Sequence, residues 1–256
     1  MKIASWNVNS LRVRLPQVLK WLDEARPDVL AIQETKTEDR NFPVAELRAA
    51  GYHVVFNGQP TYNGVAILSR DPAEVFASAL PDFEDPQKRV LGARIGNIAV
   101  LDLYVPNGQS LESDKYRYKL DWLAQLGAWL DALLREHPQL VMLGDFNIAP
   151  EDRDVHDPAA WDGQVLVSEP ERRAFQALLQ AGLQDSFRLH EAGSGHYSWW
   201  DYRAAGFRRN LGLRIDHVLL SAPLAERCSA AGIDRGPRGW ERPSDHTPVW
   251  VELTEP

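Results

Sequence analysis

Residues 139–147 read Gln-Leu-Val-Met-Leu-Gly-Asp-Phe-Asn, an apolar run that ends in an acid and an amide. The apolar part predicts a strand over 139–144. Asp145 and Asn147 follow it directly, and the alternation of a strand would place both side chains on the same side. This stretch therefore predicts a sheet protein with polar groups at the end of a strand.

Similar apolar or β-branched runs recur along the chain. Most are bounded by Gly, Pro, Asn or Asp, as strands commonly are, and Gly96-Asn97 between two of them predicts a tight hairpin. The predicted strands are 2–8, 28–33, 52–57, 64–69, 90–95, 98–105, 139–144, 197–202, 215–221, 227–233 and 248–253.

Helical patterns lie between these strands, near 15–25, 43–50, 113–136 and 169–181. The third carries an apolar stripe at helical spacing, which indicates core packing. Ser168 with Glu171 three residues later predicts a capping box at the start of the fourth. Strands interleaved with few helices predict an α/β or α+β protein with large sheets, and we expect a single domain over 1–256 because no linker or low-complexity segment interrupts the chain.

The composition narrows the class of protein. No apolar run approaches the ~20 residues that span a bilayer, and the N-terminus turns polar at Asn7, so we expect no membrane segment and no signal peptide. The single cysteine, Cys228, excludes an internal disulfide and favours the cytoplasm, a reducing compartment. With one cysteine and scattered histidines, a zinc site is not expected, and any metal should be hard and oxygen-bound.

The formal net charge of -8 argues mildly against a nucleic-acid partner. A metallonuclease, however, concentrates carboxylates in its cleft, and the distribution of charge matters more than its sum. Local basic clusters are present at Arg12/Arg14, Lys88-Arg89, Lys115/Arg117/Lys119, Arg203, Arg208-Arg209/Arg214 and Arg235/Arg238/Arg242.

Acids and amides gather at the ends of predicted strands. Asn7 ends the first strand and Glu34 follows the second. Asp216 opens a later strand, and Asp245-His246 directly precede the last one. Polar groups at strand ends that are distant in sequence are how an active site at a sheet edge is assembled.

These residue types suit phosphodiester hydrolysis. A hard cation held by Glu34 and another carboxylate would neutralise developing charge. A carboxylate, or a His oriented by one, can deprotonate water, and amide or phenol groups can donate to phosphate oxygens. Each residue alone also has a plain structural interpretation, such as a turn for Gly144-Asp145-Phe146-Asn147 or a strand aromatic for Tyr104.

The ordered set of motifs is more specific than any single one. It strongly resembles the bacterial exonuclease III family of the endonuclease/exonuclease/phosphatase superfamily, from residue 1 to about 253. The resemblance implies a four-layer α/β-sandwich, in which two mainly antiparallel β-sheets pack face to face with helices outside. Its motifs are Ser-Trp-Asn-Val-Asn-Ser-Leu-Arg (5–12), Gln-Glu-Thr-Lys (33–36), Tyr-Asn-Gly-Val-Ala-Ile-Leu (62–68), Tyr-Val-Pro-Asn-Gly (104–108), Gly-Asp-Phe-Asn-Ile-Ala-Pro (144–150), Tyr-Ser-Trp-Trp-Asp-Tyr-Arg (197–203), Asn-Leu-Gly-Leu-Arg-Ile-Asp (210–216) and Ser-Asp-His-Thr-Pro-Val (244–249).

The resemblance also implies roles for the site residues. Glu34 would be the main ligand of Mg²⁺, for which Mn²⁺ would substitute. Asp145 would orient or deprotonate the attacking water, and His246, paired with Asp216, would bind a phosphate oxygen. Asp245 would be a metal-side or orienting carboxylate. The implied catalytic residues are Tyr104, Asp145, Asn147, Asp216 and His246, and the implied metal site is Asn7, Glu34, Asp145, Asn147, Asp245 and His246.

The segments 197–202 and 210–215 resemble a pocket for a flipped-out abasic sugar, because an apolar slot fits a deoxyribose that lacks its base. Lys36 and Lys119 are weaker candidates for phosphate contacts, and the loop 151–167 matches no part of the family pattern. The expected DNA contacts are Asn9, Asn63, Trp199, Asn210, Leu213, Arg214 and Ile215.

Three functions remain in competition. The first is an abasic-site endonuclease that also has 3′–5′ exonuclease and 3′-end-cleaning activity, and that acts as a monomer on double-stranded DNA with abasic sites or 3′ ends. The second is a phosphoesterase of the superfamily acting on a small lipid or inositol phosphate, and the motifs at 197–202 and 210–216 argue against it. The third is a non-catalytic nucleic-acid-binding regulator, which should have lost part of the catalytic set that is present here.

Overall fold

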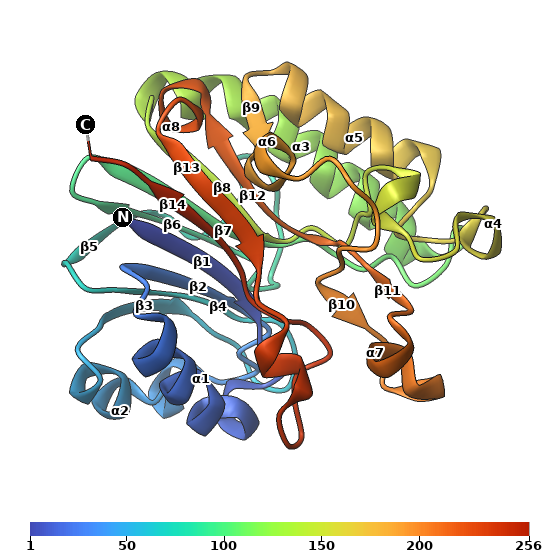
Figure 1. Ribbon diagram of the computed structural model, residues 1–256. Coiled ribbons are helices and arrows are strands. Elements are labelled where there is room, and N and C mark those ends of the chain that lie inside the picture. Colours follow the sequence, from blue (N-terminus) through green and yellow to red (C-terminus); the bar gives the residue numbers. More distant parts are fainter. Residues whose placement is uncertain (256) are drawn as a thin grey trace.

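The computed structural model describes residues 1–255, and in this range two six-stranded β-sheets pack face to face (Figure 1). The first sheet has the order β13 (Cys228–Ile233), β14 (Val249–Leu253), β1 (Lys2–Asn7), β2 (Val29–Gln33), β4 (Val65–Ser69), β3 (His53–Asn57). The second has the order β5 (Ala73–Ala77), β6 (Val90–Ile95), β7 (Ile98–Tyr104), β8 (Leu140–Asp145), β12 (Asp216–Ser221), β9 (Leu183–Asp185).

Strand direction follows from the connections. β1 and β2 run parallel and are joined by helix α1 (Leu11–Ala25), and β7 and β8 run parallel and are joined by α3 (Asp114–Glu136). Parallel neighbours need such a crossover, whereas antiparallel ones can be joined by short turns. The Gly96-Asn97 turn between β6 and β7 is the predicted hairpin, with Ile95 opposite Ile98. The remaining neighbours in both sheets are antiparallel, which confirms the predicted sandwich of mainly antiparallel sheets.

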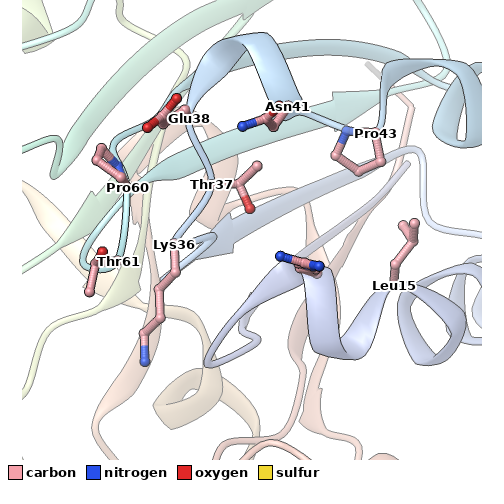
Figure 2. A pocket seen from close by; sticks show the side chains of 9 residues that line it. Leu15, Lys36, Thr37, Glu38, Asn41, Pro43, Pro60 and Thr61 are labelled. Atoms are coloured by element: carbon pink, nitrogen blue, oxygen red, sulfur yellow. The ribbon is translucent and has the colours of Figure 1, made fainter.

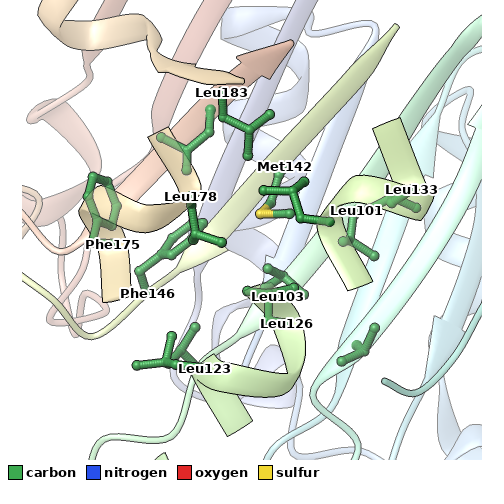
Figure 3. Close-up of a cluster of buried hydrophobic side chains, with 14 of the residues drawn as sticks. Leu101, Leu103, Leu123, Leu126, Leu133, Met142, Phe146, Phe175, Leu178 and Leu183 are labelled. Carbon is green, nitrogen blue, oxygen red and sulfur yellow. The ribbon is translucent and has the colours of Figure 1, made fainter. Parts of the chain in front are cut away.

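Three apolar layers hold the sandwich together. Inward side chains of both sheets, such as Ile67 and Val141, meet in the middle. Helices α1 and α2 (Val44–Ala49) cover the first sheet through residues such as Trp21. Helices α3 and α5 (Glu169–Gln180) cover the second, with Phe175 packed on Phe146 (Figure 3). Burial of these side chains is the main stabilising contribution to the fold.

The predicted elements are largely present. The capping box of α5 is confirmed, since Ser168 and Glu171 bond to each other's backbone N–H groups. Helix α1 begins at Leu11, before the predicted start at 15, and Pro16 lies inside it. No helix in residues 1–255 is long and apolar enough to cross a membrane.

Three strands, β5, β9 and β11 (Gly212–Leu213), and several short helices were not predicted. β5 is an edge strand with an exposed face and β9 has three residues, so neither carries a clear alternating pattern. The predicted strand 197–202 is only β10 (Trp199–Trp200), paired with β11 in a separate two-stranded sheet. The short helices are η1 (Asp39–Asn41), η2 (Asp152–Asp154), α4 (Pro158–Trp161), α6 (Ser186–His190), η3 (Arg203–Ala205), α7 (Gly206–Arg209), α8 (Ala222–Ala225) and η4 (Gly236–Gly239).

Candidate active site

The two sheets bring the polar strand ends together. Residues of β7, β8 and β12 that face the other sheet alternate with outward ones, so Tyr104, Asp145 and Asp216 share the inner face. They are also neighbours in register, with Asp145 opposite both Tyr104 and Asp216. Asn7 ends β1 in the opposing sheet, and its Nδ2 donates to Asp145 Oδ2 at 2.9 Å. The site therefore lies where the two sheets meet at one end of the sandwich.

Three side chains form a group that suits a metal ion. One ligand atom from each of Glu34, Asp145 and His246 lies within 4.8 Å of the others. Asn7 Nδ2 also donates to Glu34 Oε1 at 2.9 Å, and Lys36 Nζ lies 3.1 Å from Glu34 Oε2. Carboxylate oxygens are the ligands that Mg²⁺ prefers, so the donor set fits a hard divalent cation.

The pKa of Asp145 reflects this environment. Burial raises the pKa of its carboxyl to about 7 and the nearby Asp216 carboxylate adds to the rise, while His246 and the amide of Asn7 oppose it. A buried carboxyl beside other carboxylates favours a positive counter-charge. This is a second indication that the group suits a cation.

His246 is fixed by a carboxylate partner. Its Nδ1 lies 2.9 Å from Asp216 Oδ2, and its Nε2 lies 3.6 Å from Asp145 Oδ2. Burial of the imidazole would lower its pKa, but the carboxylates of Asp216 and Asp145 outweigh this and raise it to about 10. Ser198 Oγ also donates to Asp216 Oδ2 at 2.7 Å. The predicted Asp216–His246 pair is thus present, with Nε2 turned toward the carboxylates of the site.

Asn147 lies beside Asp145 as predicted, but the alternation of side chains along a strand is not the reason. β8 ends at Asp145, and Asn147 turns away at φ 50° while its N–H donates to Asp145 Oδ1 at 2.9 Å. Its Nδ2 donates to the Val105 carbonyl and its Oδ1 accepts from Asn107 Nδ2. A turn with side-chain hydrogen bonds, rather than a continued strand, places this amide in the site.

Tyr104 ends β7 beside these residues. Burial raises the pKa of its phenol well above the usual value, and the carboxylates of Glu34 and Asp145 raise it further. The phenol is therefore a neutral hydrogen-bond donor at physiological pH.

Asp245 is held by two donors. Trp199 Nε1 donates to its Oδ2 at 3.0 Å, and Asn9 Nδ2 donates to its Oδ1 at 3.1 Å. Asn9 in turn accepts from Lys36 Nζ at 2.7 Å. These bonds favour an orienting role for Asp245 over that of a direct metal ligand.

Arg214, predicted to contact a DNA phosphate, has acidic partners inside the fold, and its contact with DNA stays a prediction. Its side chain is 1% exposed, and its guanidinium pairs with Asp154 at 2.6 Å and Asp185 at 2.8 Å. Lys119 is likewise buried, where it pairs with Glu171 and donates to the Asn147 carbonyl. Both side chains therefore form internal ion pairs, because buried acidic residues that are distant in the sequence neutralise their charges.

The predicted sugar slot is closed. Leu213 and Ile215 are 0% and 1% exposed and pack with Leu166 and the half-buried Trp199 in one apolar cluster. Trp161 of α4 meets Trp199 edge to face, with ring centroids 6.4 Å apart. The residues predicted to share a pocket do lie together, but the loop 151–167 fills the space between them.

Two other predicted DNA contacts have internal partners. Asn63 is 7% exposed and donates to the side-chain oxygens of Gln59 and Gln87. Asn210 accepts from Trp200 Nε1 and donates to the Gly195 carbonyl. Their contact with DNA stays a prediction.

The sequence did not single out a buried network just below the site. Gln33, next to Glu34, donates to Ser5 Oγ at 2.9 Å and to Asp102 Oδ1 at 2.7 Å, which ties the two sheets together. Gln33 lies in the motif 33–36, but nothing in the local sequence indicates that its side chain connects the two sheets. Burial raises the pKa of Asp102 well above its usual value.

A pocket of about 500 Å³ opens beside the site, lined among others by Arg12 and Lys36 (Figure 2). Figure 2 shows Lys36 and Thr61 on the loops that follow β2 and β3. Two basic side chains therefore lie at this edge, one of them, Lys36, beside the carboxylate of Glu34.

Comparison with known proteins agrees with this geometry. Residues 4–246 match the model of the endonuclease/exonuclease/phosphatase family. The chain belongs to this family. It is 38% identical to exodeoxyribonuclease III of Haemophilus influenzae over 99% of this chain and 100% of that one.

Two solved structures of family members also cover the whole of both chains. One is a 3′ phosphatase, NExo, from Neisseria bound to a product DNA hairpin, with a TM-score of 0.95 and 46% identity. The other is an AP endonuclease from Archaeoglobus fulgidus, with a TM-score of 0.96 and 42% identity. The predicted family and fold are confirmed, and with them the prediction of a hydrolytic enzyme rather than a regulator.

Proposed function

We propose that this protein is a metal-dependent DNA repair nuclease that incises abasic sites, removes nucleotides from 3′ ends and cleans blocked 3′ ends. The substrate is double-stranded DNA. A monomer suffices, because Asn7, Glu34, Asp145 and His246 come from one chain. The domain that acts is the whole of 1–256.

The observation that carries the proposal is the convergence of Glu34, Asp145 and the Asp216–His246 pair at one point between the sheets. Phosphodiester hydrolysis needs a cation site, a group that activates water and donors for the phosphate oxygens, and this arrangement offers all three within reach of one phosphorus atom. The relationship to exodeoxyribonuclease III and to an AP endonuclease supports DNA as the substrate.

Each residue has a part in the reaction. Asp145 orients the attacking water and accepts its proton. His246 Nε2, held in place by Asp216 on Nδ1, donates to a non-bridging phosphate oxygen. Tyr104 donates to the phosphate or to the leaving oxygen, and Asn147 holds the phosphate. Water then attacks phosphorus opposite the leaving 3′ oxygen, which belongs to the nucleotide before the abasic or removed one, or to the terminal nucleotide when a 3′ phosphate is released.

Mg²⁺ fits the acidic group, with Glu34 as the main ligand and Asn7 beside it, and Mn²⁺ substitutes. When bound, the ion supplies positive charge that stabilises the developing negative charge on the phosphate. The hydrogen bonds of Asp245 to Trp199 and Asn9 suit a residue that orients this ligand set.

The closed apolar cluster favours a second candidate, in which 3′-end processing is the main activity. An abasic sugar within a duplex needs a slot at Leu213 and Ile215, and these side chains are buried. A 3′ end needs no such slot. A relative with 46% identity is described as a 3′ phosphatase, and one with 42% as an AP endonuclease, so both candidates have a counterpart in the family.

The decisive experiment compares three labelled substrates with the purified protein: a duplex with one tetrahydrofuran abasic analogue, an undamaged recessed 3′ end and a recessed end with a 3′ phosphate. We expect cleavage with Mg²⁺ and none with EDTA. Glu34→Gln and Asp145→Asn should each lower the rate by about 10²- to 10³-fold, whereas Asp121→Asn, an exposed acid on α3, should not.

The rates on the three substrates separate the candidates. Fastest incision of the analogue supports the abasic endonuclease. Faster processing of either 3′ end, with little incision, supports the second candidate. If the protein cuts none of the three substrates, it is not a DNA repair nuclease.

A further inference from the structure

Arg89 lies directly beneath Tyr104, on the neighbouring strand end. Its guanidinium carbon is 4.7 Å from the centre of the Tyr104 ring. Its Nη1 donates to the Tyr104 carbonyl at 3.1 Å, and the Tyr104 N–H donates to the Arg89 carbonyl at 2.8 Å. Side chain and backbone of Arg89 thus hold one residue of the site from two directions.

Arg89 is a buried cation without an acidic partner. It is 9% exposed, and within residues 1–255 no carboxylate oxygen lies within 4 Å of its guanidinium. Its Nε and Nη2 donate instead to the amide oxygen of Gln87, at 3.1 and 2.8 Å. Other buried cations such as Arg214 and Lys119 do have carboxylate partners. A buried charge without an acidic partner is costly, so the position of Arg89 next to a site residue suggests that it acts on that residue.

The surroundings keep the guanidinium in this place. Gln87 Oε1 also accepts from Asn63, and the Gln87 N–H donates to Asp85 Oδ1. Asp85 uses its other oxygen to accept from the Tyr118 hydroxyl at 2.5 Å. The nearby acid is therefore occupied by neutral groups. The guanidinium faces two aromatic rings, Tyr104 at 4.7 Å and the more distant Tyr118 at 6.0 Å.

We propose that Arg89 is a positioning residue for Tyr104: it fixes the angle of the phenol ring, and its unpaired charge below the ring strengthens the hydroxyl as a hydrogen-bond donor to the scissile phosphate. A cation on an aromatic face draws electron density from the ring, and a more polarised O–H donates a stronger hydrogen bond, the more so in a buried site. This inference rests on the proposed function, in which Tyr104 donates to the phosphate or leaving oxygen.

The test is a double-mutant cycle on the substrate that the wild-type protein cuts fastest, with Arg89→Met, Tyr104→Phe and the double variant. Arg89→Met should lower kcat about tenfold and change KM less than twofold. In the Tyr104→Phe background it should have almost no further effect, because the hydroxyl through which Arg89 acts is gone. Arg117→Met, an exposed arginine on α3 paired with Asp114, is the control that should change nothing.

A second variant covers the case in which Arg89→Met does not fold. Gln87→Glu keeps the acceptor oxygen for Arg89 and Asn63 but places a carboxylate on the guanidinium, and it should also lower kcat only when Tyr104 is present. A 3-fluorotyrosine at position 104 reports on the ring directly, and its ¹⁹F resonance should shift in both Arg89→Met and Gln87→Glu and not in Arg117→Met.

Additive effects in the cycle, or a raised KM with unchanged kcat, would overturn the inference, since Arg89 would then act on the substrate or on the fold. An unshifted ¹⁹F signal would overturn it as well. If the wild-type protein cuts no DNA substrate, the proposed function fails, and the ¹⁹F signal alone then decides whether Arg89 orders the phenol.

Discussion

Asp216 is buried beneath the site, and two groups of the site depend on it. It accepts from His246 Nδ1 at 2.9 Å and from Ser198 Oγ at 2.7 Å, and it is 1% exposed. By holding Nδ1 it leaves Nε2 to face Asp145, 3.6 Å away. The imidazole acts in the site only in the orientation that this carboxylate imposes.

Asp216→Asn should therefore lower the rate of cleavage by about 10²-fold or more, because the amide no longer stabilises a charged, oriented imidazole. The fold should change little, since the amide is close to the carboxylate in size. The measurements are kcat on the preferred substrate and the thermal midpoint, with Asp131→Asn on the exposed side of α3 as the control. Unchanged activity in Asp216→Asn would show that His246 works without this partner.

For single residues, the sequence predicts which side chains meet in the site, but it does not predict which charged side chains form ion pairs inside the fold. Glu34, Asp145 and His246 are recognisable because each stands at a strand end in a motif. Arg214 stands in a motif too, but its partners are Asp154, sixty residues earlier, and Asp185. Only the folded chain shows that these acids neutralise it, because no local pattern links Arg214 to either of them.

The end of β8 shows how one element positions the chemistry. Gly144 has φ +139°, and a Cβ at this position would lie 1.9 Å from the Leu103 carbonyl oxygen of β7. The two strands approach here without a side chain between them, just before Asp145 enters the site. Only glycine allows both the backbone angle and the approach.

Gly144→Ala should lower the free energy of unfolding by about 3 kcal/mol or more and also reduce activity, since β8 and β7 must separate and Asp145 moves with them. Gly127→Ala in α3 is the matched control. Its Cβ would meet nothing within 4 Å, and it should raise stability by about 1 kcal/mol because alanine favours a helix. Urea unfolding of the three proteins tests this, and equal stability of Gly144→Ala and the parent would refute it.

At the scale of elements, the long strands and helices were predictable because their apolar patterns extend over five residues or more, as in β4 and α3. The structure of the segment 197–213 was not predictable in this way. Its aromatic run suggested a long strand, but Ala204 and Ala205 adopt positive φ and the chain turns into η3 and α7. Such turns depend on tertiary contacts, for example Arg238 donating to the Trp200 carbonyl, and have no pattern of their own.

For the molecule as a whole, a buried polar network fastens the loop 151–167 to the second sheet. Arg214 joins Asp154 of the loop to Asp185 of β9, and Nη1 of Arg214 lies 3.1 Å from His217 Nδ1. His217 Nε2 lies 2.9 Å from the Ile148 carbonyl. Burial lowers the pKa of His217 to about 4, and the charge of Arg214 lowers it further against the opposing effect of Asp185.

This lowered pKa predicts a loss of stability in mild acid. Below pH 6.5 His217 becomes protonated in the unfolded chain, whereas in the native state it stays neutral until about pH 4. As the pH falls through this range, the free energy of unfolding therefore decreases by up to about 3 kcal/mol. Asp154 and Asp185 have lowered pKa values, and their contribution is lost only at lower pH.

Protonation of Asp145 in the same pH range changes the stability in the opposite direction. The quantity to measure is therefore the difference between the wild-type protein and His217→Gln. Unfolding in urea at pH 7.5 and pH 4.5 should show a smaller loss for His217→Gln than for the parent. His53→Gln, at an exposed site, should behave like the parent. Parallel curves for all three proteins would mean that His217 does not couple to folding.

The place of β14 in the first sheet bears on when the enzyme can act during its own synthesis. This strand comes late in the chain, directly after His246, yet it lies between β1 and β13 and pairs with both. A polypeptide still emerging from the ribosome has Glu34 and Asp145 long before it has the imidazole, and its first sheet stays open until β14 enters between two strands made earlier. A chain interrupted before residue 246 therefore lacks both the imidazole that lies beside Asp145 and the strand that completes the first sheet.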